Sequence, residues 1–138
     1  MKKLLLFLAL TLCICGSVDA KKTWKRGQAE WAKIQLTDKL SYDQAFAIVL
    51  ELVADKYEME MISKDGGYIR SAWNPLRDKK GKKVKDQRCR ITIKFNHDQT
   101  QLQVKTECQK LRKGEWEDGE DTALSAQIKD DIRGVLGY

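Results

Sequence analysis

The chain has 138 residues, of which 26 are basic and 20 acidic, with one histidine and four cysteines. This length predicts a single domain around one hydrophobic core. His97 stands alone in a predicted turn, and the chain has neither zinc-ligand spacing nor a glycine-rich phosphate loop, which argues against a metal centre, a cofactor and most enzyme classes.

The first twenty residues have the layout of a secretory signal peptide. Lys2 and Lys3 precede an apolar run over 4–15, and Val18-Asp19-Ala20 provides the short side chains of a cleavage site. The run is shorter than the roughly 20 apolar residues that cross a membrane. We therefore expect cleavage after Ala20 and a mature chain in the periplasm or the extracellular space.

Lipidation of Cys15 is the alternative at this end of the chain. Leu12 lies three residues before Cys15, as in a lipoprotein signal. Ile14 is too large for the position before a lipidated cysteine, so the sequence favours the soluble product. Only the lipidated form would associate with a membrane.

The mature chain begins with a basic segment, residues 21–31, and the domain is expected to span 32–138. Ala32, Ile34 and Leu36 alternate with polar residues, which predicts a short strand with one buried face.

A helix is predicted to begin after Ser41. Ser41 and Gln44 have the spacing of a capping box, in which each side chain accepts from the other residue's backbone N–H. Apolar residues follow at helical intervals to about residue 55. A second helix is expected to start near Asp121 or Thr122, and Gly137 suits its C-terminal end.

Four strands are predicted between the helices. The first two cover 57–61 and 68–73 and are joined by a glycine-containing turn. Trp73 is in phase with Ile69 and is therefore expected in the core. A polar, lysine-rich loop over 76–87 follows.

The last two strands, 88–95 and 101–108, form the clearest hairpin. A four-residue turn sets a register in which Cys89 lies opposite Cys108, on the apolar face. Because export leads to an oxidising compartment, we predict a disulfide between them, with two buried thiols as the alternative.

The predicted order is β-α-β-β-β-β-α, an α+β domain in which an antiparallel sheet has two helices packed on one face. The run from Tyr57 to Trp73, the basic strand starting at Arg88 and its partner over 102–106 resemble bacterial envelope lipoprotein domains of helix-grip or TBP-like type. The C subunit of the outer-membrane β-barrel assembly machinery is one example. The resemblance covers most of residues 32–136 and implies a non-catalytic envelope module.

Positive charge is concentrated between residues 77 and 90, where eight basic residues accompany only Asp78 and Asp86. Such a segment favours an anionic envelope surface or an acidic partner protein, and export argues against nucleic acid. A solvated loop is the plain alternative. The candidate binding residues are Lys79, Lys80, Lys82, Lys83, Lys85, Arg88 and Arg90.

These patterns predict a non-enzymatic, exported cell-envelope module that binds through its polar sheet face and the 77–90 loop. An alternative is a small apolar-ligand carrier. Its pocket would lie between the first helix and the sheet, lined by Met59, Met61, Tyr57 and Phe46. An enzymatic interpretation would rest on the acidic residues of 115–121, which a following helix N-terminus favours by itself.

Overall fold

The computed structural model describes residues 23–138; the predicted signal peptide and Cys15 lie outside the described residues. Within this range the chain forms an α+β domain with two helices and an eight-stranded antiparallel sheet, which confirms the predicted fold class. The elements are β1 (Trp24–Arg26), β2 (Ala32–Gln35), α1 (Tyr42–Ala54), β3 (Met59–Ser63), β4 (Tyr68–Ser71), β5 (Asn74–Arg77), β6 (Lys83–Phe95), β7 (Gln101–Arg112), β8 (Glu115–Asp121) and α2 (Thr122–Leu136).

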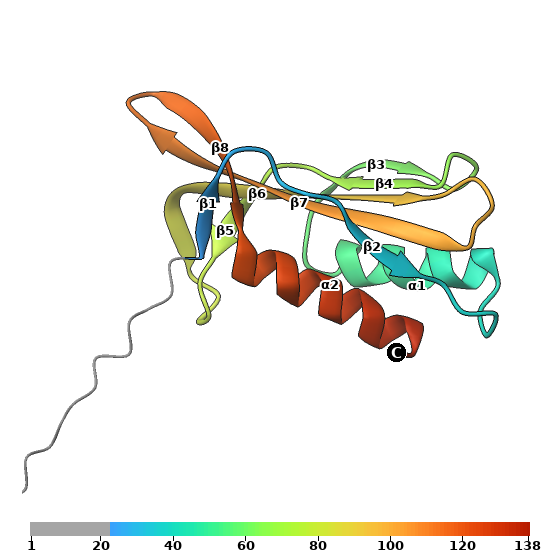
Figure 1. The fold of residues 1–138 in the computed structure, drawn as a ribbon. Helices are drawn as coiled ribbons and strands as arrows, with labels where there is room; N and C mark the ends of the chain where they lie inside the picture. The colour runs from blue at the N-terminus through green and yellow to red at the C-terminus, as the bar shows by residue number, and fades with distance from the viewer. Residues whose placement is uncertain (1–22) are drawn as a thin grey trace, which may run out of the picture.

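The long strands β6 and β7 form the centre of the sheet (Figure 1). β6 pairs with β5 over its first part and with β4 over its last part. β7 pairs on its other edge with β2 near its start and with β8 near its end. β3 and β1 then extend the sheet beyond β4 and β8. One long hairpin therefore organises all the shorter strands.

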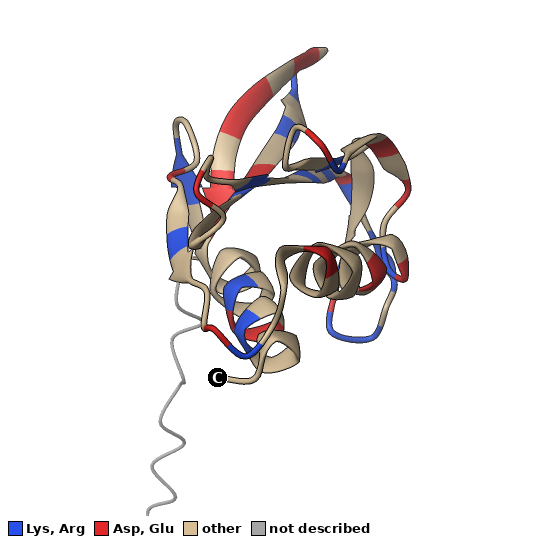
Figure 2. Cartoon of the chain, turned by 90° about the vertical axis from the view of Figure 1, so that its right-hand side faces the viewer, with Lys and Arg blue, Asp and Glu red and all other residues tan. Residues whose placement is uncertain are grey.

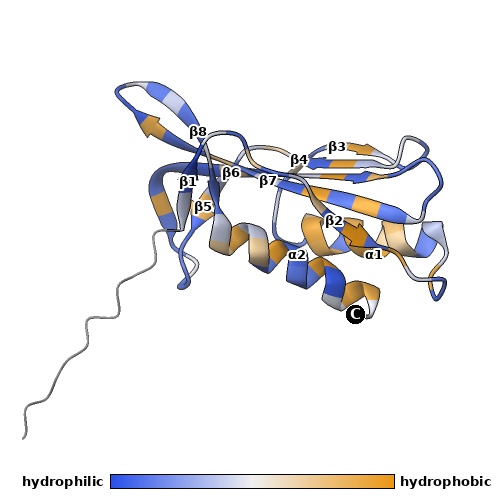
Figure 3. Ribbon diagram, in the orientation of Figure 1, coloured by the Kyte–Doolittle hydropathy of each residue, from blue (hydrophilic) through white to orange (hydrophobic). Residues whose placement is uncertain are grey.

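Both helices lie on the same side of the sheet (Figure 1). α1 begins with the predicted capping box, in which Gln44 N donates to Ser41 Oγ (3.2 Å) and Ser41 N donates to Gln44 Oε1 (2.9 Å). α2 ends at Gly137, whose φ of 90° favours glycine. The apolar sides of the helices and the inward side chains of the strands share one core (Figure 3). Its largest fully buried side chains include Ile69, Ile91, Ile93, Leu102, Ile132 and Val49.

Three strands of the structure are missing from the predicted order. β5 contains Pro75, which suggested the end of a strand. Within residues 23–138 β5 pairs with β6 alone, and an edge strand tolerates proline. β1 lies within the basic 21–31 segment, and β8 within the acidic residues before α2. β1 and β8 pair with each other, with Lys25 opposite Glu120, so opposite charges face each other across the pair.

Candidate binding surfaces

The face of the sheet opposite the helices, here called the open face, carries mainly polar and charged side chains. Along β6, Ile91 and Ile93 are buried in the core, while Arg90 and Lys94 lie on the open face. Glu107, Asp118 and Glu120 lie on the same face, and both signs of charge occur along the sheet (Figure 2). By their strand registers, the cations of the open face are Lys25, Lys33, Arg70, Arg88, Arg90, Lys94 and Lys105.

Two arginines and two tryptophans near one end of the open face form a cluster, here called the Trp–Arg cluster. Arg88 Cζ lies 3.9 Å from the ring centroid of Trp116 and 4.8 Å from that of Trp73. Arg90 Cζ lies 4.6 Å from the Trp73 centroid. Cation–π contacts contribute about 0.5–1 kcal/mol each at exposed sites, so they restrict both guanidinium groups to positions over the rings.

Arg88 is the cation of this cluster that has no acidic partner. Its Nε donates to Gln109 Oε1 (2.8 Å), and no carboxylate of residues 23–138 lies within ion-pair distance of Arg88. Arg90, in contrast, pairs with Glu107 (Nε to Oε2, 3.1 Å). Burial, and then the neighbouring Arg90, lower the pKa of Arg88. An incoming anion would supply the counter-charge that this guanidinium lacks, and the planar N–H fork suits a carboxylate or a phosphate.

A second aromatic–cation cluster lies farther along the open face. Lys94 Nζ lies 4.9 Å from the ring centroid of Trp31 and 5.8 Å from that of Tyr68. Lys105 Nζ lies 5.0 Å from the Trp31 centroid and 3.4 Å from Glu107 Oε1. Because Glu107 also pairs with an arginine of the Trp–Arg cluster, it connects the two clusters.

A shallow groove of about 400 Å³ lies beside the Trp–Arg cluster, lined by residues 83–88, Leu111 and the two tryptophans. Trp116 is 39% exposed and pairs across β8 and β7 with Leu111. Trp73 was expected in the core with Ile69, and the structure contradicts this. Residues 72 and 73 lie between β4 and β5, so the strand alternation is interrupted and Trp73 contacts the open-face arginines.

The seven predicted binding residues do not form one surface. Arg88 and Arg90 lie in the Trp–Arg cluster, and Lys83 and Lys85 line the groove beside it. The turn between β5 and β6 lies on the helix side of the sheet (Figure 1). That turn holds the remaining three, Lys79, Lys80 and Lys82.

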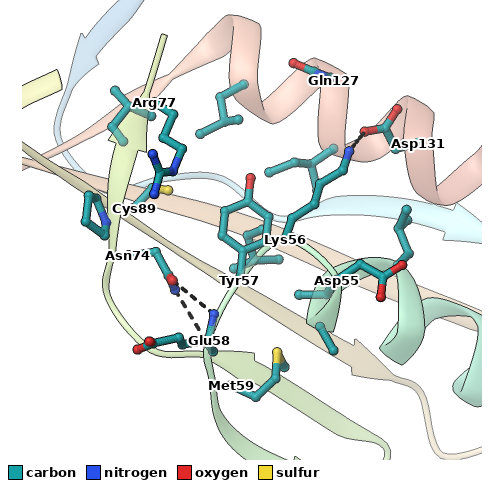
Figure 4. A pocket seen from close by; sticks show the side chains of 18 of the residues that line it. Asp55, Lys56, Tyr57, Glu58, Met59, Asn74, Arg77, Cys89, Gln127 and Asp131 are labelled. Atoms are coloured by element: carbon teal, nitrogen blue, oxygen red, sulfur yellow. Dashed lines mark hydrogen bonds and ion pairs between the residues drawn. The ribbon is translucent and has the colours of Figure 1, made fainter. Parts of the chain in front are cut away.

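A cleft of about 1090 Å³ opens on the helix side, between the C-terminal end of α1, α2 and the β5–β6 end of the sheet (Figure 4). Of the four residues proposed to line an apolar pocket, Tyr57 and Met59 line this cleft. Phe46 is instead buried in the core, and Met61 is 47% exposed outside the cleft. The cleft therefore lies beyond the end of α1 and not along its length.

Asn74 holds the wall of this cleft in place. Its Oδ1 accepts from Glu58 N (3.0 Å), and its Nδ2 donates to Ala72 O (2.8 Å). These bonds fix the chain immediately after Tyr57, whose side chain points into the cleft (Figure 4). Burial raises the pKa of Tyr57 to about 12, so its hydroxyl stays protonated at neutral pH.

The predicted register of the two cysteines is confirmed, because Cys89 pairs directly with Cys108 in β6 and β7. Both are buried free cysteines in the structure, each 1% exposed. They form a small second apolar cluster with Leu76, against which Trp24 packs. The disulfide between them stays a prediction.

The remaining candidate residues do not come together in a site. The described residues 23–138 hold no group of three or more potential metal ligands, and His97 is exposed in the β6–β7 turn. The acidic residues of 115–121 line neither the cleft nor the groove, and Glu117 pairs with Arg112 and Arg26. No helix in this part of the chain has the length and apolar character needed to cross a membrane.

No family model matches the chain, and no curated protein matches its sequence. The resemblance to envelope lipoprotein domains therefore stays a prediction, and the functional argument rests on the geometry of the two surfaces.

Proposed function

We propose that the chain is a non-enzymatic, exported module that binds an anionic component of the cell envelope through its open face. The observation that carries this proposal is the Trp–Arg cluster, in which Arg88 is partly buried, stacked beside two tryptophans and without a carboxylate partner among residues 23–138. The predicted signal peptide supports export of the chain to the cell envelope.

The chemistry of the open face favours a carboxylate or phosphate ligand. A partly desolvated arginine gains more from an incoming anion than a solvated lysine does, because less water has to be displaced from it. The tryptophans beside it add apolar contact area at little cost in side-chain entropy, and Trp and Arg are the residues most often found at energetically important interface positions. Lys94 and Lys105 continue the positive charge along the face.

The binding surface differs from the one that the sequence suggested. The sheet face remains part of it, and so do Arg88 and Arg90 with the groove beside them. The β5–β6 turn, which carries Lys79, Lys80 and Lys82, lies on the other side of the sheet and is not included (Figure 1).

The test compares two charge reversals of equal size. Exported protein carrying Arg88→Glu and Arg90→Glu is expected to bind isolated envelopes about 100-fold more weakly than the unchanged protein, because each lost charged contact costs about tenfold. Binding is measured by co-sedimentation over a range of salt concentrations. The unchanged protein should bind more weakly as salt rises, because salt screens exposed charges.

The matched control replaces Lys79 and Lys80 by glutamate, which changes the net charge equally but on the turn. This variant is expected to bind within about threefold of the unchanged protein. Denaturant unfolding of both variants checks that they fold. Loss of binding in the turn variant with retention in the Arg88/Arg90 variant would rule out the open face as the site.

A further inference from the structure

The cleft on the helix side has its own pattern of polarity, and it shares Pro75 and Lys83 with the groove beside the Trp–Arg cluster. Its inner wall is apolar, since Leu76, Ile91 and Ile128 are buried and Leu124 packs beside them. A cavity of about 300–1,000 Å³ with an apolar lining and a few polar groups is the usual form of a small-molecule site. At about 1090 Å³, the cleft is large enough for a ligand of that size.

Charge at the mouth of the cleft is unevenly distributed. On the side of α2, Lys56 and Asp131 form an ion pair (3.5 Å), so these two charges offset each other (Figure 4). On the β5–β6 side, Arg77 and Lys83 are paired in the strand register and line the cleft together. Asp55 and Glu58 also line the cleft, in the segment between α1 and β3, so the positive end of the cleft is the end under the β5–β6 turn.

Asp78 also lines this end of the cleft and forms no ion pair with Arg77 or Lys83. Its Oδ1 accepts from Lys80 N and Lys82 N (both 2.9 Å), so the carboxylate is engaged by the backbone of its own turn. Arg77 Nη1 donates to Gly81 O (2.8 Å), which orients the guanidinium. Neither Arg77 nor Lys83 has an ion-pair partner among the described residues 23–138.

Tyr57 adds a directed donor inside the cleft. Its side chain points into the cleft (Figure 4), and its hydroxyl makes no hydrogen bond with residues 23–138. Tyr57 is half-buried at the cleft, so its hydroxyl is free to donate to a ligand that enters. A ligand that fits this cleft has an apolar body, because the inner wall is apolar. Its head is anionic and accepts a hydrogen bond, because two unpaired cations and a free hydroxyl lie beside it.

We propose that this cleft binds an anionic amphiphile with a carboxylate or phosphate head. The acyl chain lies against Leu124, Ile128 and the neighbouring apolar wall. The head lies under the β5–β6 turn, where Arg77 and Lys83 supply the counter-charge. Tyr57 donates its hydroxyl hydrogen to the head group.

The experiment titrates the full exported protein with dodecanoate, dodecyl phosphate and the neutral dodecanol, each below its micelle concentration, by isothermal titration calorimetry. At least one of the two anionic probes should bind with a micromolar Kd, and dodecanol at least tenfold more weakly. Comparison of the two anions identifies which head group the cleft accepts. Failure of both anions to bind, or equal affinity for dodecanol, would overturn the proposal.

Three variants tie binding to the cleft. Arg77→Gln with Lys83→Gln should weaken binding of the anion at least tenfold without changing the affinity for dodecanol, and Tyr57→Phe should weaken anion binding severalfold. Lys94→Gln with Lys105→Gln removes two charges from the open face and should leave anion binding unchanged. Equal loss in the open-face variant would place the amphiphile elsewhere. Because envelope co-sedimentation does not require the cleft, failure here leaves the proposed function standing.

Discussion

Reduction of the exported protein is expected to lower its free energy of unfolding by about 3 kcal/mol, because we expect Cys89 and Cys108 to be joined after export. In the chain-entropy model, a disulfide lowers the conformational entropy of the unfolded chain. For a loop of this length, the lost entropy corresponds to about 3 kcal/mol of stability. The effect would be a large share of the stability of a small domain.

The hydrogen bonds of the β6–β7 hairpin favour this bond. Asn96 N donates to Gln101 O (2.9 Å), which makes these residues a hydrogen-bonded pair. Such pairs alternate along an antiparallel ladder, so Cys89 and Cys108, seven positions along, form a non-hydrogen-bonded pair. The Cα atoms of these pairs lie about 4.5 Å apart, within the range that a disulfide spans.

The chemistry of the two thiols indicates when the bond forms. Burial raises the pKa of Cys89 to about 12 and that of Cys108 to about 11. Thiolates carry out disulfide exchange, so the folded, reduced chain reacts slowly at neutral pH. Oxidation is therefore expected during folding: two thiols lose their protons and two electrons pass to a disulfide-exchanging oxidant of the compartment.

The measurement is denaturant unfolding of the exported protein with and without a reductant, together with its intact mass. The double variant Cys89→Ala/Cys108→Ala serves as the control and should be insensitive to the reductant. The cysteines would be shown to be free by two results together. The protein unfolded without reductant would react with two equivalents of thiol reagent, and its free energy of unfolding would be the same with and without reductant.

Replacement of Gly119 by valine is expected to destabilise the domain by about 2–3 kcal/mol, the usual range for an over-packed site. Gly119 is buried in β8, and a Cβ at this position would overlap the ring of Trp24 in β1. The backbone of Gly119 does not have a positive φ, so the conflict is one of space alone. To relieve it, Trp24 has to leave the cysteine cluster that it covers.

A double-mutant cycle tests whether Trp24 is the cause. In a Trp24→Ala background the valine meets no ring, so Gly119→Val should change the free energy of unfolding by less than about 0.5 kcal/mol. The free energies are obtained from chemical denaturation of the four proteins. Equal losses with and without Trp24 would mean that another contact disfavours the valine.

Sequence patterns predicted those elements whose signal is local. Ser41 and Gln44 carry a capping signal within one turn of helix, and the 88–95 and 101–108 strands alternate regularly about a short turn. For these elements the local pattern and the tertiary structure agree. The pairing of Cys89 with Cys108 could be derived because, in a regular hairpin, the length of the turn fixes which residues of the two strands lie opposite each other.

The elements that sequence patterns missed depend on distant partners. β1 and β8 are charged segments whose pairing becomes favourable only when Lys25 meets Glu120, which lies 95 positions away. The open face was similarly hard to predict. Trp31 and Trp116 meet Lys94 and Arg88 only after strands distant in the sequence have paired. Trp73 follows the end of β4, where the regular alternation of inward and outward side chains stops.

The most direct test of the open face as a binding surface is site-specific photo-crosslinking in the native envelope. A photoreactive residue replaces Gln103, which lies between Lys33 and Lys94 on the open face, and in a matched variant it replaces the exposed Ala126 on α2. We expect a discrete cross-linked product from position 103 and none from position 126. A product from position 126 with none from position 103 would contradict the proposal and place the binding surface on the helix side.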